Sequence, residues 1–151
     1  GPIQGIPVYT SFGDNQTPFL GCEAEEDQLL LNIGTEAQLL AIDRQKSERY
    51  ECRPYFDVRT LCTVSGLVGG HTIRMSGQSD LEDRLYKSYS EAIARLPAKK
   101  SLLLTGGTAA YYPRLLERVC SRLGLPWRAV EGASALRGLS KIAENTACPR
   151  G

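Results

Sequence analysis

The first part of the chain alternates short apolar runs with turn residues, a pattern typical of β-strands. The first run ends at Gly13, and the second and third are separated only by Gly34-Thr35, which predicts a hairpin. Between the first and second runs, residues 15–22 predict a short helix with Pro18 in its first turn, where the missing N–H costs little. The predicted strands span residues 7–12, 28–33, 36–42, 50–56 and 58–64.

From Asp80 onward the apolar period changes from two to about four, which predicts helices. The first of these is expected to be capped by Asp80 and stopped by Pro97. Its apolar stripe consists of Leu81, Leu85, Tyr89, Ile93 and Leu96. The segments that follow are a buried strand at 101–105, a helix over 115–123 that ends at Gly124, a strand at 126–130 and a helix over 133–143 with Leu136, Leu139 and Ile142 on its apolar face.

Length and spacing favour a single α/β domain. The chain has 151 residues, enough to bury a core without disulfides or a metal ion. The apolar pattern lapses at 74–80, where we expect a short linker. The predicted order is strands first, followed by alternating helices and strands.

The charge balance argues against nucleic acid or an anionic membrane as a partner. Eighteen basic and seventeen acidic residues leave a net charge of +1. The five cysteines show no Cys-x-x-Cys spacing and there is one histidine, so we expect no metal site and reduced thiols in a cytoplasmic protein. No apolar run approaches the roughly 20 residues that span a bilayer.

Three junctions between apolar runs and small polar residues carry the candidate chemistry. Asp14 follows the first strand and can orient an attacking hydroxyl. Gly34-Thr35 can present a backbone N–H and a hydroxyl to a phosphate. The turn formed by Gly106, Gly107 and Thr108 joins a buried strand to a helix, where α/β proteins place ligands. Together these features suggest phosphoryl transfer at a nucleotide site.

Each candidate also has a simpler interpretation. An Asp after Gly is commonly a turn former or helix cap, and Gln16 can bind a sugar hydroxyl or face solvent. Gly34-Thr35 can be an ordinary hairpin turn, and Gly106-Gly107 a plain strand-to-helix joint. Composition alone supports only a flexible turn at Gly69-Gly70. We expect Tyr55, Phe56 and Trp127 in the core, and Arg114, Arg118 and Arg122 on a solvated helix face.

Several of these segments resemble, in the same order, the C-terminal domain of FGGY-type carbohydrate kinases, and among them the sedoheptulokinases most. The looser part of the resemblance begins near residue 84 and includes Thr-Gly-Gly-Thr at 105–108 and Leu-Pro-Trp at 125–127. The closer segments are Gly-Asp-Asn-Gln at 13–16, Leu-Asn-Ile-Gly-Thr-Glu-Ala-Gln-Leu at 31–39, Arg-Pro-Tyr-Phe-Asp at 53–57 and Val-Ser-Gly-Leu-Val-Gly-Gly at 64–70.

The resemblance implies a ribonuclease-H-like half-domain of the actin and hexokinase type, a mixed sheet with helices on both faces. It further implies phosphorylation of a ketose by ATP with Mg²⁺, with Asp14 as the base and Gln16 near the sugar. Gly34, Thr35 and the turn at 106–108 would bind the nucleotide, with Gly69 and Gly70 allowing a helix to approach it closely.

Four departures from that family leave other functions open. The family's N-terminal domain is absent from this sequence, and its long insert between residues 70 and 85 is reduced to a short linker. The adenosine loop continues with Tyr111-Tyr112-Pro113 where the family usually has Asn, and Ala135-Leu136-Arg137-Gly138-Leu139 replaces a small-residue ending. A non-catalytic nucleotide-binding or protein-interaction module, or another actin-like protein, is the alternative. A lone half should expose apolar surface and associate with a missing domain or a second copy.

Overall fold

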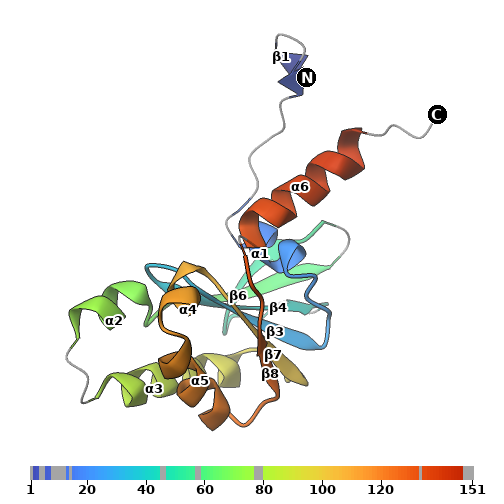
Figure 1. Ribbon diagram of the computed structural model, residues 1–151. Coiled ribbons are helices and arrows are strands. Elements are labelled where there is room, and N and C mark those ends of the chain that lie inside the picture. The colour runs from blue at the N-terminus through green and yellow to red at the C-terminus, as the bar shows by residue number, and fades with distance from the viewer. Residues whose placement is uncertain are drawn as a thin grey trace.

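A six-stranded mixed sheet forms the centre of the protein (Figure 1). The computed structural model describes residues 2–3, 6–7, 13, 15–44, 47–56, 59–76, 80–132 and 134–147. The strand order is β5-β6-β4-β3-β7-β8, and a separate antiparallel ribbon pairs β1 (Pro2–Ile3) with β2 (Ile6–Pro7). The sheet strands are β3 (Gln28–Ile33), β4 (Ala37–Asp43), β5 (Glu51–Pro54), β6 (Thr60–Leu67), β7 (Ser101–Thr105) and β8 (Trp127–Ala129).

The direction of the strands changes across the sheet. β3 runs parallel to β7, and β7 parallel to β8, whereas the pairs β3–β4, β4–β6 and β6–β5 are antiparallel. The central strands β3 and β7 are continuous apolar runs because both of their faces are buried. β5 is mostly exposed and ends at Pro54, as suits an edge strand that needs no further donor.

Helices cover both faces of the sheet, as the expected fold requires. One core cluster packs β-strand residues against Ile73, Tyr89 and Val119, which belong to three different helices on one face. The other cluster packs Phe19 and Cys22 against the opposite face. The helices are α1 (Gln16–Gly21), α2 (Gly70–Met75), α3 (Leu81–Arg95), α4 (Gly107–Tyr111), α5 (Pro113–Arg122) and α6 (Ser134–Ala147).

Most of the predicted elements are confirmed to within a few residues. The structure adds α2 and α4, two short helices that begin at glycines and were expected to be turns. Asp80 occupies the N-cap position of α3 but makes no side-chain capping hydrogen bond. The predicted strand at 7–12 lies outside the described residues except for Pro7, and the expected linker begins within the last two residues of α2, with 77–79 undescribed.

The apolar face expected for the last helix is wrong. Leu136 and Leu139 on α6 are 64% and 43% exposed, and only Ile142 is buried. The reason is a close helix contact with α1: a Cβ added at Gly138 would lie 2.0 Å from the carbonyl oxygen of Thr17. α6 therefore packs against α1 at Gly138, and Leu136 and Leu139 face outward. The helix extends away from the sheet (Figure 1).

Two further side-chain expectations need correction. Tyr55 and Trp127 are half-buried against the core, but Phe56 is 41% exposed. Arg118 and Arg122 form ion pairs with Glu82 on α3, at 2.8 and 3.3 Å, so this helix face is bridged to its neighbour as well as solvated. Among the residues that the structure describes, no helix has the length and apolar character to cross a bilayer.

Candidate nucleotide site

The predicted glycine turns meet at one edge of the sheet. Because β3 and β7 are parallel, their carboxyl ends bring Gly34-Thr35 and Gly106-Gly107 side by side. β6 is antiparallel to β4 and pairs Leu67 with Ala37, so its end delivers Gly69-Gly70 to the same edge. Ligands of α/β proteins bind outside the carboxyl ends of parallel strands, which makes this edge the candidate site.

Hydrogen bonds lock these turns together. The Gly34 carbonyl oxygen accepts from the Gly70 N–H at 2.9 Å and from the Thr108 hydroxyl at 2.9 Å. The His71 N–H donates to the Thr35 carbonyl at 2.9 Å. A Cβ added at Gly70 would lie 2.3 Å from the Thr108 hydroxyl oxygen, so only glycine permits this contact. The start of α2 therefore lies tightly against the Gly34 turn and Thr108.

Thr108 braces the turns from inside. Its side chain is buried and its hydroxyl is occupied by the Gly34 carbonyl. Thr35, in contrast, is exposed at the tip of the β3–β4 hairpin, where its hydroxyl can reach a ligand. The two threonines singled out in the sequence thus differ in position: one holds the scaffold and the other lies on its surface.

Gly106 sets the direction of the loop that follows β7. Its φ of 107° and ψ of 157° belong to a region that is essentially restricted to glycine. A Cβ there would lie 2.4 Å from the carbonyl oxygen of Ile33 on the neighbouring strand. The next residue, Gly107, has open space around its Cβ position and begins α4.

Of the remaining predicted site residues, the structure places Gln16. Asp14, the candidate base, lies outside the described residues. Gln16 is the first residue of α1, and its amide is used internally: the oxygen accepts from the Gly13 N–H at 3.1 Å and the nitrogen donates to the Pro54 carbonyl at 2.6 Å. Gln16 therefore ties the start of α1 to the end of β5.

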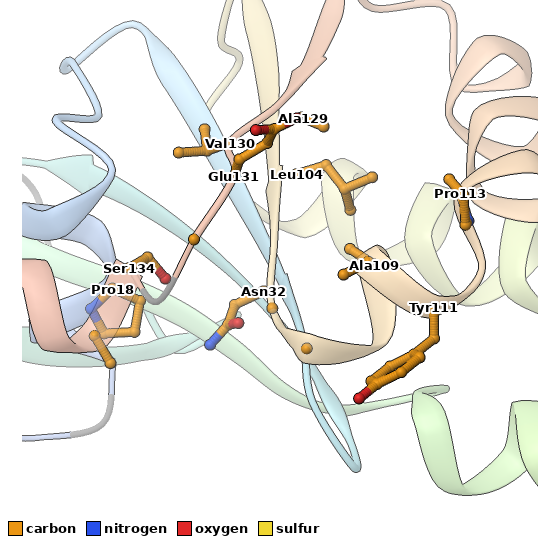
Figure 2. Close-up of a pocket in the computed structure, with 15 residues that line it drawn as sticks. Pro18, Asn32, Leu104, Ala109, Tyr111, Pro113, Ala129, Val130, Glu131 and Ser134 are labelled. Carbon is orange, nitrogen blue, oxygen red and sulfur yellow. The ribbon is translucent and has the colours of Figure 1, made fainter.

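A pocket of about 860 Å³ opens beside the Gly106-Gly107 turn (Figure 2). Asn32 and Ser134 lie on one side of it, and Tyr111 and Pro113 on the other. Most of the remaining lining is apolar: Pro18, Leu104, Ala109, Ala110, Ala129, Val130 and Ala135, with Glu131 and Gly132 at the loop after β8. A mostly apolar cavity with a few polar groups is typical of small-molecule sites.

Sequence reasoning missed several of these lining residues. Asn32 lines the pocket, because its strand neighbour in β7 is Thr105, directly before the glycine turn. Tyr111 is 82% exposed and lies at the rim. Pairing of β3 with β7 was the signal that could have located Asn32; nothing local in the sequence points to Ser134.

A polar contact supports the base of the pocket. Thr105 donates its hydroxyl hydrogen to the Ser134 hydroxyl oxygen at 3.1 Å, and both residues are buried. Cys22 of the α1 segment lies against this pair, and burial raises the pKa of its thiol although hydrogen bonds with Thr105 and Ser134 oppose the shift. The neutral thiol serves as packing, and the hydroxyl pair joins β7 to α6.

The arrangement fits a nucleoside with a phosphate tail. The apolar pocket can hold a flat base and a ribose, and the glycine turns next to it can bring backbone groups close to phosphate oxygens. Among the described residues, no group of three or more His, Cys, Asp or Glu side chains could hold a metal ion. Mg²⁺ commonly keeps several waters and is held mainly by substrate phosphates, so such an ion needs few protein ligands at this edge.

Comparisons with known proteins identify the fold. Neither a sequence-family model nor a curated protein sequence matches the chain. Similar solved structures include xylulose kinase from Lactobacillus acidophilus with bound ligand, at a TM-score of 0.71 and 11% identity, covering 91% of this chain and 42% of that one. Gluconate kinase from the same organism gives 0.70 and 14%, covering 89% and 42%. Xylulose kinase from Bifidobacterium adolescentis gives 0.69 and 13%, covering 83% and 38%.

The chain therefore spans less than half the length of these similar proteins. At such low identity the likeness concerns the fold, including the mixed sheet with helices on both faces. The chain has the actin and hexokinase type of ribonuclease-H-like fold, and this fold matches part of the xylulose kinase and gluconate kinase structures.

Proposed function

We propose that this chain is the nucleotide-binding half of an ATP-dependent sugar kinase. The observation that carries the proposal is the convergence of the turns at Gly34, Gly70 and Gly106 on one sheet edge, beside a pocket large enough for a nucleoside. Similarity to the folds of xylulose and gluconate kinases supports it. In this proposal the base and ribose occupy the pocket and the phosphates extend toward Thr35.

The proposed acceptor is a hydroxyl of a ketose, with sedoheptulose as the first candidate. Support comes from the segments that resemble sedoheptulokinases, above all Gly-Asp-Asn-Gln at 13–16. Asp14 would accept the proton of the attacking hydroxyl, and Mg²⁺ bound mainly to the phosphates would supply charge stabilisation. Gln16 forms hydrogen bonds with Pro54 and with the Gly13 backbone, so we propose that its main role is to position the chain next to Asp14 and that contact with the sugar is secondary.

Full activity is proposed to need a second domain. The proposed compartment is the cytoplasm. Phosphoryl transfer depends on positioning and on closing the site to water, which a single half-site does poorly. The similar kinases contain more than twice the matched length. We expect this chain alone to bind nucleotide and to transfer phosphate weakly or not at all.

A second candidate is a non-catalytic module that binds nucleotide or protein. The specific observation in its favour is Tyr111, a large exposed side chain at the pocket rim, in the segment Tyr111-Tyr112-Pro113 that stands where the resembled family usually has Asn. Such a module would keep the scaffold of glycine turns without an acceptor site.

Isothermal titration with ATP and Mg²⁺ tests the proposal. Thr35→Val removes an exposed hydroxyl from the hairpin tip, and Gly107→Val adds a side chain at a residue that lines the pocket. Both should weaken binding at least tenfold. Thr60→Val is the matched control, because Thr60 begins β6 at the opposite edge of the sheet.

Two results separate the candidates. Nucleotide binding that weakens in both site variants but not in the control, with phosphate transfer to sedoheptulose once a complementary N-terminal kinase domain is added, supports the kinase. Binding without transfer under any of these conditions supports the module. Absence of ATP binding by the folded wild-type chain would refute the nucleotide site itself.

A further inference from the structure

Two cysteines lie directly opposite each other at the far side of the sheet from the pocket. Cys52 on the edge strand β5 and Cys62 on β6 are register partners in an antiparallel pair. Opposed residues in such a pair project from the same face of the sheet. Both are free thiols; Cys62 is buried in the core and Cys52 is partly exposed.

The hydrogen-bond pattern identifies the type of pair. The Tyr55 N–H donates to the Arg59 carbonyl at 3.0 Å, and hydrogen-bonded pairs alternate along an antiparallel ladder. The next pair, Pro54 and Thr60, is therefore non-hydrogen-bonded, as suits Pro54, which has no N–H. Two pairs further along the ladder, Cys52 and Cys62 form a non-hydrogen-bonded pair as well. The Cα atoms of such pairs lie about 4.5 Å apart, within the range of about 4.4–6.8 Å found in disulfides.

The surroundings of the two thiols differ in a way that orders their reactivity. Burial, together with charge on Cys52 and Asp43, raises the pKa of Cys62 to about 12, so Cys62 is a poor first nucleophile. Because the two thiols are register partners on one face of the sheet, they lie close enough to interact, and this interaction contributes to the raised pKa of Cys62. Cys52 is the thiol that solvent can reach, and its Sγ lies 3.9 Å from the Ser47 and Tyr50 carbonyl oxygens.

We propose that Cys52 and Cys62 form a redox-active dithiol that hydrogen peroxide converts into a cross-strand disulfide. The Cys52 thiolate attacks the peroxide, forming an S–O bond as the O–O bond breaks and one water is released. Cys62 then attacks the sulfenic sulfur of Cys52; the S–S bond forms, the S–O bond breaks, and the Cys62 proton leaves with the hydroxide as a second water. Two electrons pass from the sulfurs to the peroxide, and a dithiol reductant reverses the change.

The disulfide would fasten the edge of the sheet. β5 is mostly exposed, and its terminal carbonyl, from Pro54, accepts a hydrogen bond from the side-chain amide of Gln16. Joining β5 covalently to β6 therefore restrains the support of α1. Oxidation should raise the thermal stability of the chain, since a closed loop restricts the unfolded state.

Peptide mapping after oxidation tests the pair directly. The full-length chain is treated with hydrogen peroxide, its remaining thiols are alkylated, and it is digested with trypsin. Cleavage after Arg59 separates the cysteines onto peptides 50–59 and 60–74, because the bond between Arg53 and Pro54 resists trypsin. We expect these two peptides to be linked, with a mass two hydrogens below their sum, and to separate on reduction.

Variants and isotope labelling make the outcome decisive. Cys52→Ser, at the partly exposed member of the pair, should abolish the linked peptide and the gain in melting temperature, whereas Cys148→Ser should leave both unchanged. A mixture of ¹⁵N-labelled and unlabelled chains should yield no linked peptide of mixed mass. Alkylated, unlinked peptides after peroxide treatment, or linkage only between chains, would overturn the proposal.

Discussion

Replacing Gly106 with Ala should destabilise the protein strongly, because two independent costs fall on one methyl group. The backbone at Gly106, with φ 107° and ψ 157°, lies in a region that other residues enter at a cost of about 1–3 kcal/mol. The added Cβ would also lie 2.4 Å from the carbonyl oxygen of Ile33, the last residue of β3. Such overpacking costs a further 1–3 kcal/mol, roughly.

The expected loss of about 2–6 kcal/mol is a large part of the total stability of a domain, which is about 5–15 kcal/mol. Urea unfolding measures it. With a slope of about 1–3 kcal/mol per molar urea, the midpoint should fall by about 1 M or more while the slope stays the same.

The neighbouring glycine provides the matched control. A Cβ at Gly107 meets nothing within 4 Å, and the residue is the first of α4, so Gly107→Ala should be neutral or stabilise the fold by about 0.5–1 kcal/mol. Equal midpoints for Gly106→Ala and Gly107→Ala would refute the geometry assigned to this turn.

Three other perturbations probe different parts of the account. Gly138→Ala places a methyl 2.0 Å from the Thr17 carbonyl oxygen and should cost about 1–3 kcal/mol in urea unfolding, although Ala is the better helix former; a gain in stability would contradict the close packing of α1 and α6. A hydrogen bond with Arg118 lowers the pKa of Glu82 in the folded state, so the ionised Glu82 stabilises the fold above the ordinary pKa of 4.5, and this stabilisation is lost as the pH falls through the lowered folded pKa. Glu82→Gln should therefore lower the urea midpoint at neutral pH and converge with the wild type in acid. A difference in midpoint that stays constant with pH would be inconsistent with the ion pair. Light scattering over a concentration series should show self-association that Leu136→Lys weakens, because Leu136 is 64% exposed, whereas a monomer at every concentration would argue against a missing partner surface.

The sequence predicted the strands and long helices well because their apolar periods are strong. The run at 101–105 is apolar throughout and became β7, buried on both faces, and Leu81, Leu85 and Tyr89 face the core from α3 as expected. Of the three junctions expected to form one site, the turns at Gly34-Thr35 and Gly106-Gly107 lie side by side at the ends of parallel strands, whereas Asp14 lies outside the described residues.

Other features depended on contacts that no local pattern contains. α6 presents Leu136 and Leu139 to solvent because Gly138 must meet the α1 backbone, a constraint visible only once both helices are placed. α2 was missed because a six-residue helix that begins at Gly70 has a weak propensity and is held by packing on the Gly34 turn. The role of Thr108 as a brace likewise required knowledge of its partner 74 residues away.

The most direct test of the central proposal is to record which backbone amides respond to ATP. In a ¹⁵N-labelled sample, addition of ATP with Mg²⁺ should shift the amide signals of Gly34, Thr35, Gly70 and Gly107 together, with saturation at a common affinity, while the signals of β5 stay in place. Shifts confined to other parts of the sheet, or a spectrum unchanged at millimolar ATP, would contradict a nucleotide site at this edge.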